Sequence, residues 1–440
     1  MHFSRTQRCD APRWDGQLAC FRMCAIIKAG VRPNRLQSRH TYLVPHKGAA
    51  IAHAGERILH WRGTSMKIDV EKLRAEIPAT EEYAYLNHAV VSPLPRRVSE
   101  AVARFVADRG LEPRFYTKWQ ELEDMFRQAA ARLIHAEPEE ITFVHSTAEG
   151  LSAVAQSLPL AAGDNVVLCD VEYPANVYPW MNLASKGVET RIIPHREGGL
   201  SIEDLEEAVD DHTRVVTVSS VEFLTGFHND LTRIGTLCRE RGIYFAVDAI
   251  QSLGMIPMDV HAYGIDFLAA GGYKWLMGPL GTGLLYVRQE LIEQLRPVYV
   301  GASSVVGGKG FLDYDLTFRP DATRFKLGTI NKAGMAGLLV AMEFLMDVGI
   351  EAIEARTRHL TDVLIADLQR RGYEIASCLR PERRSAIVSF VVPDPQTACA
   401  TLYERGVVVA PREGYIRVAP HFYNTEAEVL CVGDVLGDAR

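Results

Sequence analysis

Lys274 is the residue with the clearest chemical potential in this 440-residue chain. It lies in the run AAGGYKWLMGP and is the only lysine between Gly187 and Gly308. Burial among such neighbours disfavours the charged ammonium and lowers its pKa, so the side chain could act as a neutral amine that forms a Schiff base or takes a proton. A lysine here could also extend along an apolar surface to water, and its partners must decide between the two interpretations.

An acid and an amide precede this lysine in the sequence. Asp248 ends the apolar run IYFAVD, and Gln251 follows three residues later. A carboxylate at the end of a buried strand needs a cationic or hydrogen-bonding partner, and a protonated pyridine nitrogen would be one. Gln251 could then bind a ring oxygen of the same cofactor. In the alternative interpretation, Asp248 is a helix N-cap and Gln251 is a solvated side chain.

Two further segments follow strand-like runs. Ser146, Thr147 and Ala148 open a helix directly after ITFVH, so backbone N–H groups and two hydroxyls meet at the positive end of a helix dipole. Such a turn can hold a phosphate, although an ordinary capping box closed by Glu149 gives the same pattern. Tyr173, in VEYPANVYPW, could stack on a flat ring, and a core tyrosine is the alternative.

The elements that would position these residues alternate along the chain. From about residue 95, helix-period segments alternate with runs such as NVVLC, TRIIP and RVVTVS, which predicts a mostly parallel sheet wrapped by helices. Ligands collect at the carboxyl ends of such strands. After about residue 335, one long helix and the runs IVSFVV, GVVVA and YIRVA predict a smaller α+β domain. We therefore expect an N-terminal arm and large domain over 66–334 and a small domain over 335–440.

Composition excludes several classes of protein. With 48% hydrophobic and 23% charged residues the chain is typical of globular proteins, and no apolar run approaches the roughly 20 residues of a membrane span. Residues 1–66 hold 11 Lys and Arg against 3 Asp and Glu, whereas the rest holds 37 against 52, and this acidic body argues against nucleic acid as a partner. We expect the basic head, 1–65, to be unstructured or not part of the native chain, since a secretory signal or transit peptide fits less well.

Motifs for other chemistries are missing from the sequence. The eight cysteines form no C-x-x-C pair, which argues against a zinc ribbon or disulfide scaffold and fits a reducing, cytoplasmic compartment. GPLGTG precedes its strand, SSVVGGKG lacks two positions of a phosphate-binding loop, and no H-E-x-x-H occurs. His195 and His261 have no partner at metal-ligand spacing, so we predict no metal site.

The runs VDAIQSLG, DFLAA and GGYKWLMGPLGTGLLYV resemble the class V aminotransferase group of pyridoxal-phosphate enzymes. That group includes cysteine desulfurases, kynureninases and isopenicillin-N-epimerase-like proteins. The resemblance extends from about Tyr85 to Asn424, through YLNHAVVSPLP, STAEG, VEYPANVYPW, RFKLGTIN and IRVAPHFYNT. It implies a fold-type-I transferase, pyridoxal 5'-phosphate (PLP) as cofactor, an amino acid as the small-molecule substrate and a homodimer.

The resemblance also implies a role for each matching residue. Lys274 would form the Schiff base with PLP and move protons, Asp248 would hold the pyridine nitrogen and Gln251 the ring oxygen. Tyr173 matches the residue that stacks on the ring, and the turn Ser146–Ala148 matches the phosphate site. With the ring nitrogen protonated, the cofactor becomes an electron sink, which weakens the Cα–H bond of a bound amino acid.

Two more matches and two departures bear on the reaction. Thr329 matches a residue that reaches the phosphate from the other subunit, and Arg417 matches the arginine that grips the substrate carboxylate. Gly271–Lys274 replaces the Ser-x-His-Lys of desulfurase-type relatives. The run GVVVAPREGYIRV lacks the reactive cysteine that desulfurases carry before this arginine, and Cys399, the nearest, lies in a predicted helix where a buried thiol is usually inert.

From this sequence we predict a PLP-dependent enzyme acting on an amino acid, with amino-group transfer favoured. Cysteine desulfuration, β-elimination or epimerisation on the same scaffold remain alternatives. A non-catalytic binding relative is a remote alternative, because a scaffold has no use for a buried lone lysine. We expect no nucleic-acid partner and no membrane association.

Overall fold

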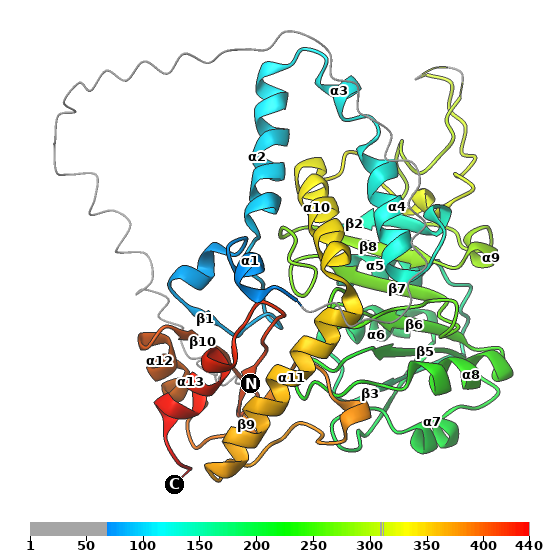
Figure 1. Ribbon diagram of the computed structural model, residues 1–440. Helices are drawn as coiled ribbons and strands as arrows, with labels where there is room; N and C mark the ends of the chain where they lie inside the picture. The colour runs from blue at the N-terminus through cyan, green and yellow to red at the C-terminus, as the bar shows by residue number, and fades with distance from the viewer. Residues whose placement is uncertain (1–67, 309, 311, 440) are drawn as a thin grey trace, which may run out of the picture. The chain divides into compact units, whose positions relative to one another are not determined.

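The computed structural model describes residues 68–439 except 309 and 311 (Figure 1). The expectation for the basic head therefore lies outside the described residues. The described part of the chain forms one compact unit.

A seven-stranded sheet forms the centre of this unit, in the order β2-β8-β7-β6-β5-β3-β4 (Figure 1). Its strands are β2 (Ile141–Val144), β3 (Asn165–Cys169), β4 (Glu189–Ile193), β5 (Thr213–Ser219), β6 (Tyr244–Asp248), β7 (Phe267–Gly271) and β8 (Gly283–Val287). Neighbouring strands are parallel except where β8 pairs with β7 and β2. This confirms the predicted mostly parallel sheet.

Both faces of the sheet are buried except at the edge strand β4, as the continuous apolar runs of the inner strands require. Side chains alternate between faces along a strand, so Leu268 and Ala270 of β7 join one core, while Phe267 and Ala269 join the other. Helices α4 (Leu122–Ile134), α8 (Leu231–Arg241) and α10 (Lys332–Val348) contribute to the first core. Helices α5 (Thr147–Ser157) and α6 (Tyr178–Met181) contribute to the second.

The remaining helices connect or cover these layers. They are α1 (Val70–Arg74), α2 (Arg96–Leu111), α3 (Phe115–Lys118), α7 (Ile202–Ala208) and α9 (Gln289–Ile292). Short 3₁₀ segments lie at Pro78–Glu81, Pro138–Glu140, Pro174–Asn176, Asn182–Lys186, Ala322–Phe325 and Pro381–Arg383.

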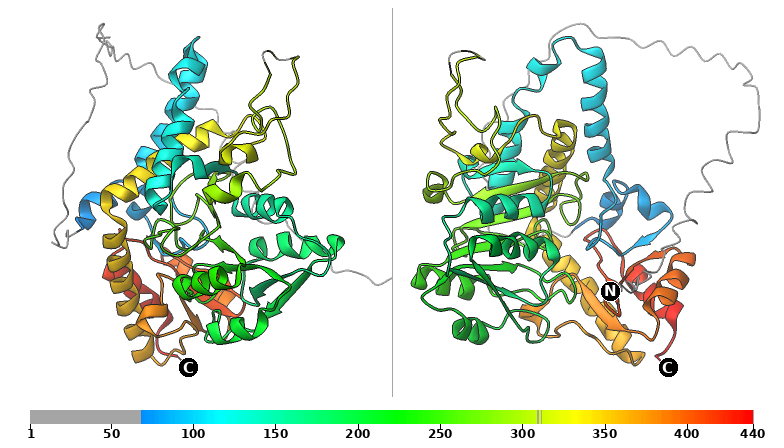
Figure 2. Two further views of the ribbon diagram at one scale, coloured as in Figure 1. Left: turned by 90° about the vertical axis from the view of Figure 1, so that its right-hand side faces the viewer. Right: turned by 180° about the vertical axis from the view of Figure 1, so that it is seen from behind.

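The C-terminal part builds a separate antiparallel sheet in the order β11-β12-β9. Its strands are β9 (Val388–Val391), β11 (Ala410–Arg412) and β12 (Tyr415–Val418), and its helices are α11 (Ile350–Arg370), α12 (Pro395–Glu404) and α13 (Glu426–Leu436). This is the predicted small α+β arrangement. The N-terminal strand β1 (Ala84–Tyr85) pairs with β10 (Val407–Val408) beside it (Figure 2). The exact boundary between the domains stays a prediction.

The prediction of one long helix after residue 335 is wrong, because the structure has two helices there. The chain breaks the helix at Gly349, whose φ of 92° suits a residue without a Cβ, and α10 and α11 bend there by 77°. Among residues 68–439, no single helix has the length and apolar character to cross a membrane. The bent pair α10 and α11 meets that test only when the two are taken together.

Candidate active site

Lys274 follows β7 and is held by its backbone. The Ser92 hydroxyl donates to the Lys274 carbonyl at 2.5 Å, and the Ser92 N–H donates to the Tyr273 carbonyl at 2.9 Å. The side chain is only 6% exposed, and no hydrogen bond or ion pair of its Nζ occurs among the described residues. Burial lowers the pKa of this amine to about 8, an effect that Asp248 opposes and the charge of Arg417 reinforces. The prediction that this lysine is buried is confirmed.

Asp248 ends β6 as a buried carboxyl with one open oxygen. Its Oδ1 accepts the N–H of Ile250 at 2.9 Å, whereas Oδ2 has no partner. Burial raises the pKa of this carboxyl to about 6, while the Ile250 N–H and the charge of Lys274 oppose the shift. The group is therefore mostly ionised at neutral pH and has an oxygen free to accept a hydrogen bond.

Gln251 is buried between two other segments and is not a solvated side chain. Its Nε2 donates to the Ala89 carbonyl at 3.1 Å, and its Oε1 accepts from the Trp275 indole at 2.9 Å. An amide nitrogen carries two hydrogens, so one donor remains for a ring oxygen. The protein itself thus fixes the orientation of this amide.

The turn before α5 shows features of both sequence interpretations. Ser146 caps the helix, since its hydroxyl accepts the Glu149 N–H at 3.1 Å, and the Glu149 carboxylate accepts the His145 N–H at 2.8 Å. The Thr147 hydroxyl accepts the Gly271 N–H at 2.9 Å, which ties the turn to the strand before Lys274. Ala148 follows in the first turn of this helix, whose N-terminal end favours an anion.

Tyr173 lies beside Lys274 and is not a core residue. Its ring centroid is 5.4 Å from the Lys274 Nζ, and its side chain is 45% exposed. The ring packs edge-on against Phe223 with centroids 5.2 Å apart. The core alternative for this tyrosine is therefore wrong, and a ring face beside the amine is available for stacking.

Arg417, on β12, reaches from the small domain to the large one. Its Nη1 donates to the Phe223 carbonyl at 2.5 Å, its Nε has no partner, and the residue is only 1% exposed. Burial lowers the pKa of this guanidinium to about 9, and the nearby charge of Arg412 adds to the effect while Tyr173 opposes it. The structure thus brings Arg417 into the same electrostatic environment as Lys274.

Thr329 stands apart from these residues. It is exposed in the segment before α10, and none of the described contacts joins it to the other candidate residues. A contact with the partner subunit's phosphate site stays a prediction.

Sequence reasoning missed a buried carboxyl beneath the site. Glu172 accepts the Ser219 N–H at 2.5 Å, the Ser219 hydroxyl at 2.6 Å and the Asn176 amide at 2.9 Å. Ser219 is the register neighbour of Asp248 in the sheet, and burial raises the pKa of Glu172 to about 7. The spacing of Glu172 and Asn176, four residues apart just after β3, was the available signal.

The two glycines before Lys274 lie in closely packed surroundings. A Cβ at Gly271, which matches the serine of Ser-x-His-Lys, would come within 3.0 Å of the Tyr273 ring and 3.1 Å of an Ile250 methyl carbon. A Cβ at Gly272 would come within 2.7 Å of a Leu338 methyl carbon and 2.8 Å of the Thr282 hydroxyl oxygen. A side chain at either position would therefore require its neighbours to shift.

None of the described cysteines is part of the hairpin before Arg417. The turn of that hairpin is formed by Glu413 and Gly414. Cys399 lies on α12, where burial raises the pKa of its thiol to about 11, so it is mostly protonated at neutral pH. Within the described residues, no group of three or more His, Cys, Asp or Glu side chains is placed to hold a metal ion.

The open atoms of this site fit PLP. Asp248 Oδ2 is free to accept a ring N–H, the Lys274 amine is free to bind an aldehyde, and the exposed ring of Tyr173 is free to stack on a pyridine. PLP has a ring nitrogen, an aldehyde and a flat ring, so it could bind all three groups at once. Unpaired buried polar atoms are costly unless a ligand satisfies them.

Fold and site together define a PLP-dependent enzyme of fold type I. The chain belongs to the class V aminotransferase family, whose family model matches residues 84–429. A probable cysteine desulfurase of Methanothermobacter thermautotrophicus is 30% identical over 395 residues, which cover 83% of this chain and 97% of that protein. The uncharacterized aminotransferase YcbU of Bacillus subtilis is 30% identical over 359 residues, covering 82% and 95%.

Solved structures of similar proteins agree with this fold. The apo cysteine desulfurase of Thermococcus onnurineus has a TM-score of 0.78 at 28% identity, covering 85% of this chain and 98% of that one. The cysteine desulfurase CsdA of Escherichia coli has a TM-score of 0.77 at 25% identity, covering 84% and 98%. The predicted fold class, family and cofactor are thereby confirmed.

Proposed function

We propose that this PLP enzyme removes sulfur from a cysteine-type amino acid. Amino-group transfer was the favoured interpretation of the sequence, but relatives named cysteine desulfurase, about 30% identical over most of their length, support the alternative better. The observation that supports a reaction at Cα is the buried, unpaired amine of Lys274, on which the charges of the Asp248 carboxylate and the Arg417 guanidinium both act.

Bound PLP would supply an aldehyde and a ring that accepts electrons. Lys274 is proposed as the residue that attaches the cofactor and carries protons to and from the substrate. Its lowered pKa supports this role, since a sizeable fraction is neutral near pH 8. Asp248 is proposed to accept the ring N–H through Oδ2, and Gln251 to donate its remaining amide hydrogen to the ring oxygen.

The other candidate residues would hold the ends of cofactor and substrate. We propose that Tyr173 stacks on the ring and that the turn 146–148 holds the phosphate. In a homodimer, Thr329 would reach the partner subunit's phosphate. Arg417 would bind the substrate α-carboxylate, because its Nε and remaining N–H groups can form two parallel bonds.

The fate of the sulfur follows from the hairpin before Arg417. A protein-bound persulfide needs a thiol beside the substrate, and Arg412, Glu413 and Gly414 occupy this part of the hairpin. We therefore propose that sulfur passes to a small thiol, giving alanine and a persulfide, or leaves as sulfide. In the second case the Cα proton is lost with the sulfide, and water converts the remaining fragment to pyruvate and ammonium.

Amino-group transfer is the second candidate. It is favoured by the same hairpin, which has no thiol to receive sulfur, and by similarity to a protein named as an aminotransferase. In this reaction the α-amino group stays on the cofactor while the substrate leaves as a keto acid.

One assay separates the two candidates. Purified holoenzyme is incubated with L-cysteine, with and without dithiothreitol, and sulfide, alanine and pyruvate are measured. We expect sulfide together with alanine or pyruvate, absent in Lys274→Ala and present in Lys186→Ala, an exposed-lysine control. Conversion of the cofactor to its amine form without release of sulfur would refute sulfur removal and support transfer.

A further inference from the structure

Arg412 is an exposed arginine beside the site that has no assigned role. It ends β11, next to the turn formed by Glu413 and Gly414. Among the described residues, its guanidinium forms no hydrogen bond and no ion pair. The adjacent Glu413 is also exposed, and the two side chains form no ion pair.

The strand register places Arg412 on the same face of the hairpin as Arg417. Ala410 pairs with Arg417 and Arg412 pairs with Tyr415. Directly opposed residues project to one face, as do residues two apart along a strand, so all four share a face. The residue directly opposite Arg417 is the small Ala410, which has no side-chain charge or hydrogen-bonding group.

The charges of this face act on the reacting amine. Arg412 and Arg417 both oppose protonation of Lys274, and Arg412 acts on Arg417 in the same way. Asp248 is the acid that offsets the charge of Lys274, and the open Oδ2 of this acid is already needed by the cofactor ring. A substrate with a single carboxylate would satisfy Arg417 and leave Arg412 unpaired.

We propose that Arg412 binds an anionic group on the substrate side chain, so that amino acids with acidic side chains are preferred over neutral ones. This inference rests on the proposed binding of the α-carboxylate by Arg417 and names the substrate class of that site. The second anion satisfies the free guanidinium and relieves repulsion between the two arginines. A side-chain carboxylate and a sulfinate share this chemistry.

Binding can be measured apart from turnover, through the change in cofactor absorbance when amino acid is added to holoenzyme. L-Aspartate and L-asparagine have nearly the same shape and differ in charge. We expect aspartate to bind at least about tenfold more tightly than asparagine, since charge-assisted bonds are the strong ones. In Arg412→Gln that ratio should fall toward one, and Arg412→Lys should retain part of it.

Arg405→Gln is the matched control, because Arg405 is also exposed on the small domain and does not act on Lys274. Calorimetry with succinate and propionate gives a second readout without any reaction. Equal binding of aspartate and asparagine by the wild type, no response to aspartate, or an unchanged ratio in Arg412→Gln would each overturn the proposal.

The same preparations separate this inference from the proposed function. Release of sulfur is measured with L-cysteine and L-cysteine sulfinate. A charge preference without release of sulfur would refute sulfur removal and leave the role of Arg412 intact. Sulfur release with no preference between cysteine and its sulfinate, and none between aspartate and asparagine, would refute the role of Arg412 alone.

Discussion

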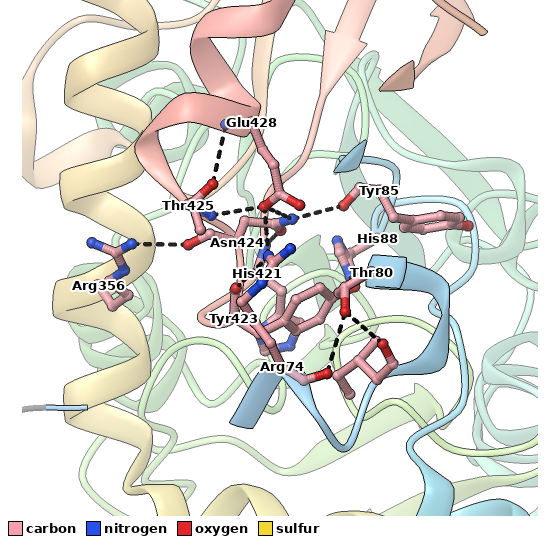
Figure 3. Close-up of polar contacts among 11 residues, drawn as sticks. Arg74, Thr80, Tyr85, His88, Arg356, His421, Tyr423, Asn424, Thr425 and Glu428 are labelled. Atoms are coloured by element: carbon pink, nitrogen blue, oxygen red, sulfur yellow. Dashed lines mark hydrogen bonds and ion pairs between the residues drawn. The ribbon is translucent and has the colours of Figure 1, made fainter. Parts of the chain in front are cut away.

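Two neighbouring regions of this molecule bury polar side chains in opposite ways. At the site, Lys274 has no partner for its amine, Asp248 Oδ2 is open and Arg417 Nε is open. In the C-terminal polar cluster, the side chains bond to one another and to backbone groups of the cluster (Figure 3). This cluster consists of Tyr85, His88, His421, Tyr423, Asn424, Thr425 and Glu428. Buried polar atoms normally find partners, so the open atoms that gather at the site are available to bind a ligand.

Asn424 illustrates the second region. Its Oδ1 accepts the His421 N–H at 2.8 Å, and its amide donates to the Tyr85 carbonyl at 3.2 Å and to Glu428 at 3.1 Å (Figure 3). Glu428 also forms the capping box of α13 with Thr425. These bonds join the N-terminal segment to the C-terminal one. The cluster therefore stabilises the fold, while the open atoms at the site are those proposed to provide the chemistry.

Among the substitutions that test this difference between the two regions, Lys274→Ala should have the largest effect on activity. If Lys274 attaches the cofactor and carries protons as proposed, loss of its amine should lower kcat by about a thousandfold or more and remove the absorbance of covalently bound PLP. The thermal stability of the cofactor-free protein should not fall, because the amine has no protein partner to lose. Activity assays, absorbance spectra and melting curves measure all three, with Lys186→Ala as control. A sharply lower melting temperature would show that Lys274 stabilises the fold, as the side chains of the C-terminal polar cluster do.

Replacement of Arg417 by alanine should mainly weaken substrate binding. Two charge-assisted bonds to a carboxylate are lost, so KM should rise about a hundredfold while PLP content stays near the wild-type level. Arg417→Lys should recover only part of the affinity, since a lysine cannot form two parallel bonds. Steady-state kinetics and cofactor content decide this, and release of PLP without a change in KM would contradict the assignment.

Asn424→Ala probes the satisfied cluster. The substitution leaves the His421 N–H and the Tyr85 carbonyl without partners, which should lower the free energy of unfolding by about 2 to 3 kcal/mol. Cofactor absorbance per folded molecule should not change. Urea denaturation provides the measurement, and Asn182→Ala, at an exposed position, should shift the same quantity by less than about 0.5 kcal/mol. If Asn424→Ala lost no stability, the claim that this cluster stabilises the fold would be wrong.

Asp248→Asn should raise the free energy of unfolding of the cofactor-free protein, by less than Asn424→Ala lowers it. Burial raises the pKa of Asp248 to about 6, above its ordinary value near 4, so the folded state holds the proton more tightly. Wild-type stability therefore falls as pH rises between these values, and the penalty is complete above pH 6. Removing the charge should gain about 1 kcal/mol at pH 8, because the buried amide offsets part of the benefit, and nothing near pH 4.

A carboxylate that has partners supplies the control for this experiment. Asp210 accepts from Asn165 at 2.9 Å and pairs with Arg191, and the Asn165 bond holds the pKa of this carboxyl below its usual range. Asp210→Asn should therefore lower the melting temperature at pH 8, opposite in sign to Asp248→Asn. Equal signs for the two variants would show that open and satisfied carboxylates do not differ as described.

Much of the sheet could be predicted from the sequence, because strand burial and side-chain alternation are local properties. The position of Asp248 at the end of β6 and the burial of Lys274 after β7 followed from their immediate neighbours. The break at Gly349 is also local, but the sequence predicted a continuous helix because the apolar pattern runs up to it.

Contacts between distant segments could not be predicted. Gln251 binds Ala89, which lies 162 residues away, and Arg417 binds the carbonyl of Phe223 at a separation of 194 residues. These bonds depend on how whole elements pack, and a backbone carbonyl leaves no signature in the sequence. The exposure of Tyr173 has the same origin, since its side chain is placed by contacts across elements and not by its neighbours in the chain.

The attachment point of the cofactor can be identified chemically. Holoenzyme is treated with sodium borohydride, which fixes PLP to the amine that holds it, and the labelled lysine is located by proteolysis and mass spectrometry. We predict that the label lies on Lys274 alone. A label on any other lysine, or none in protein that binds PLP, would contradict the assignment of this site.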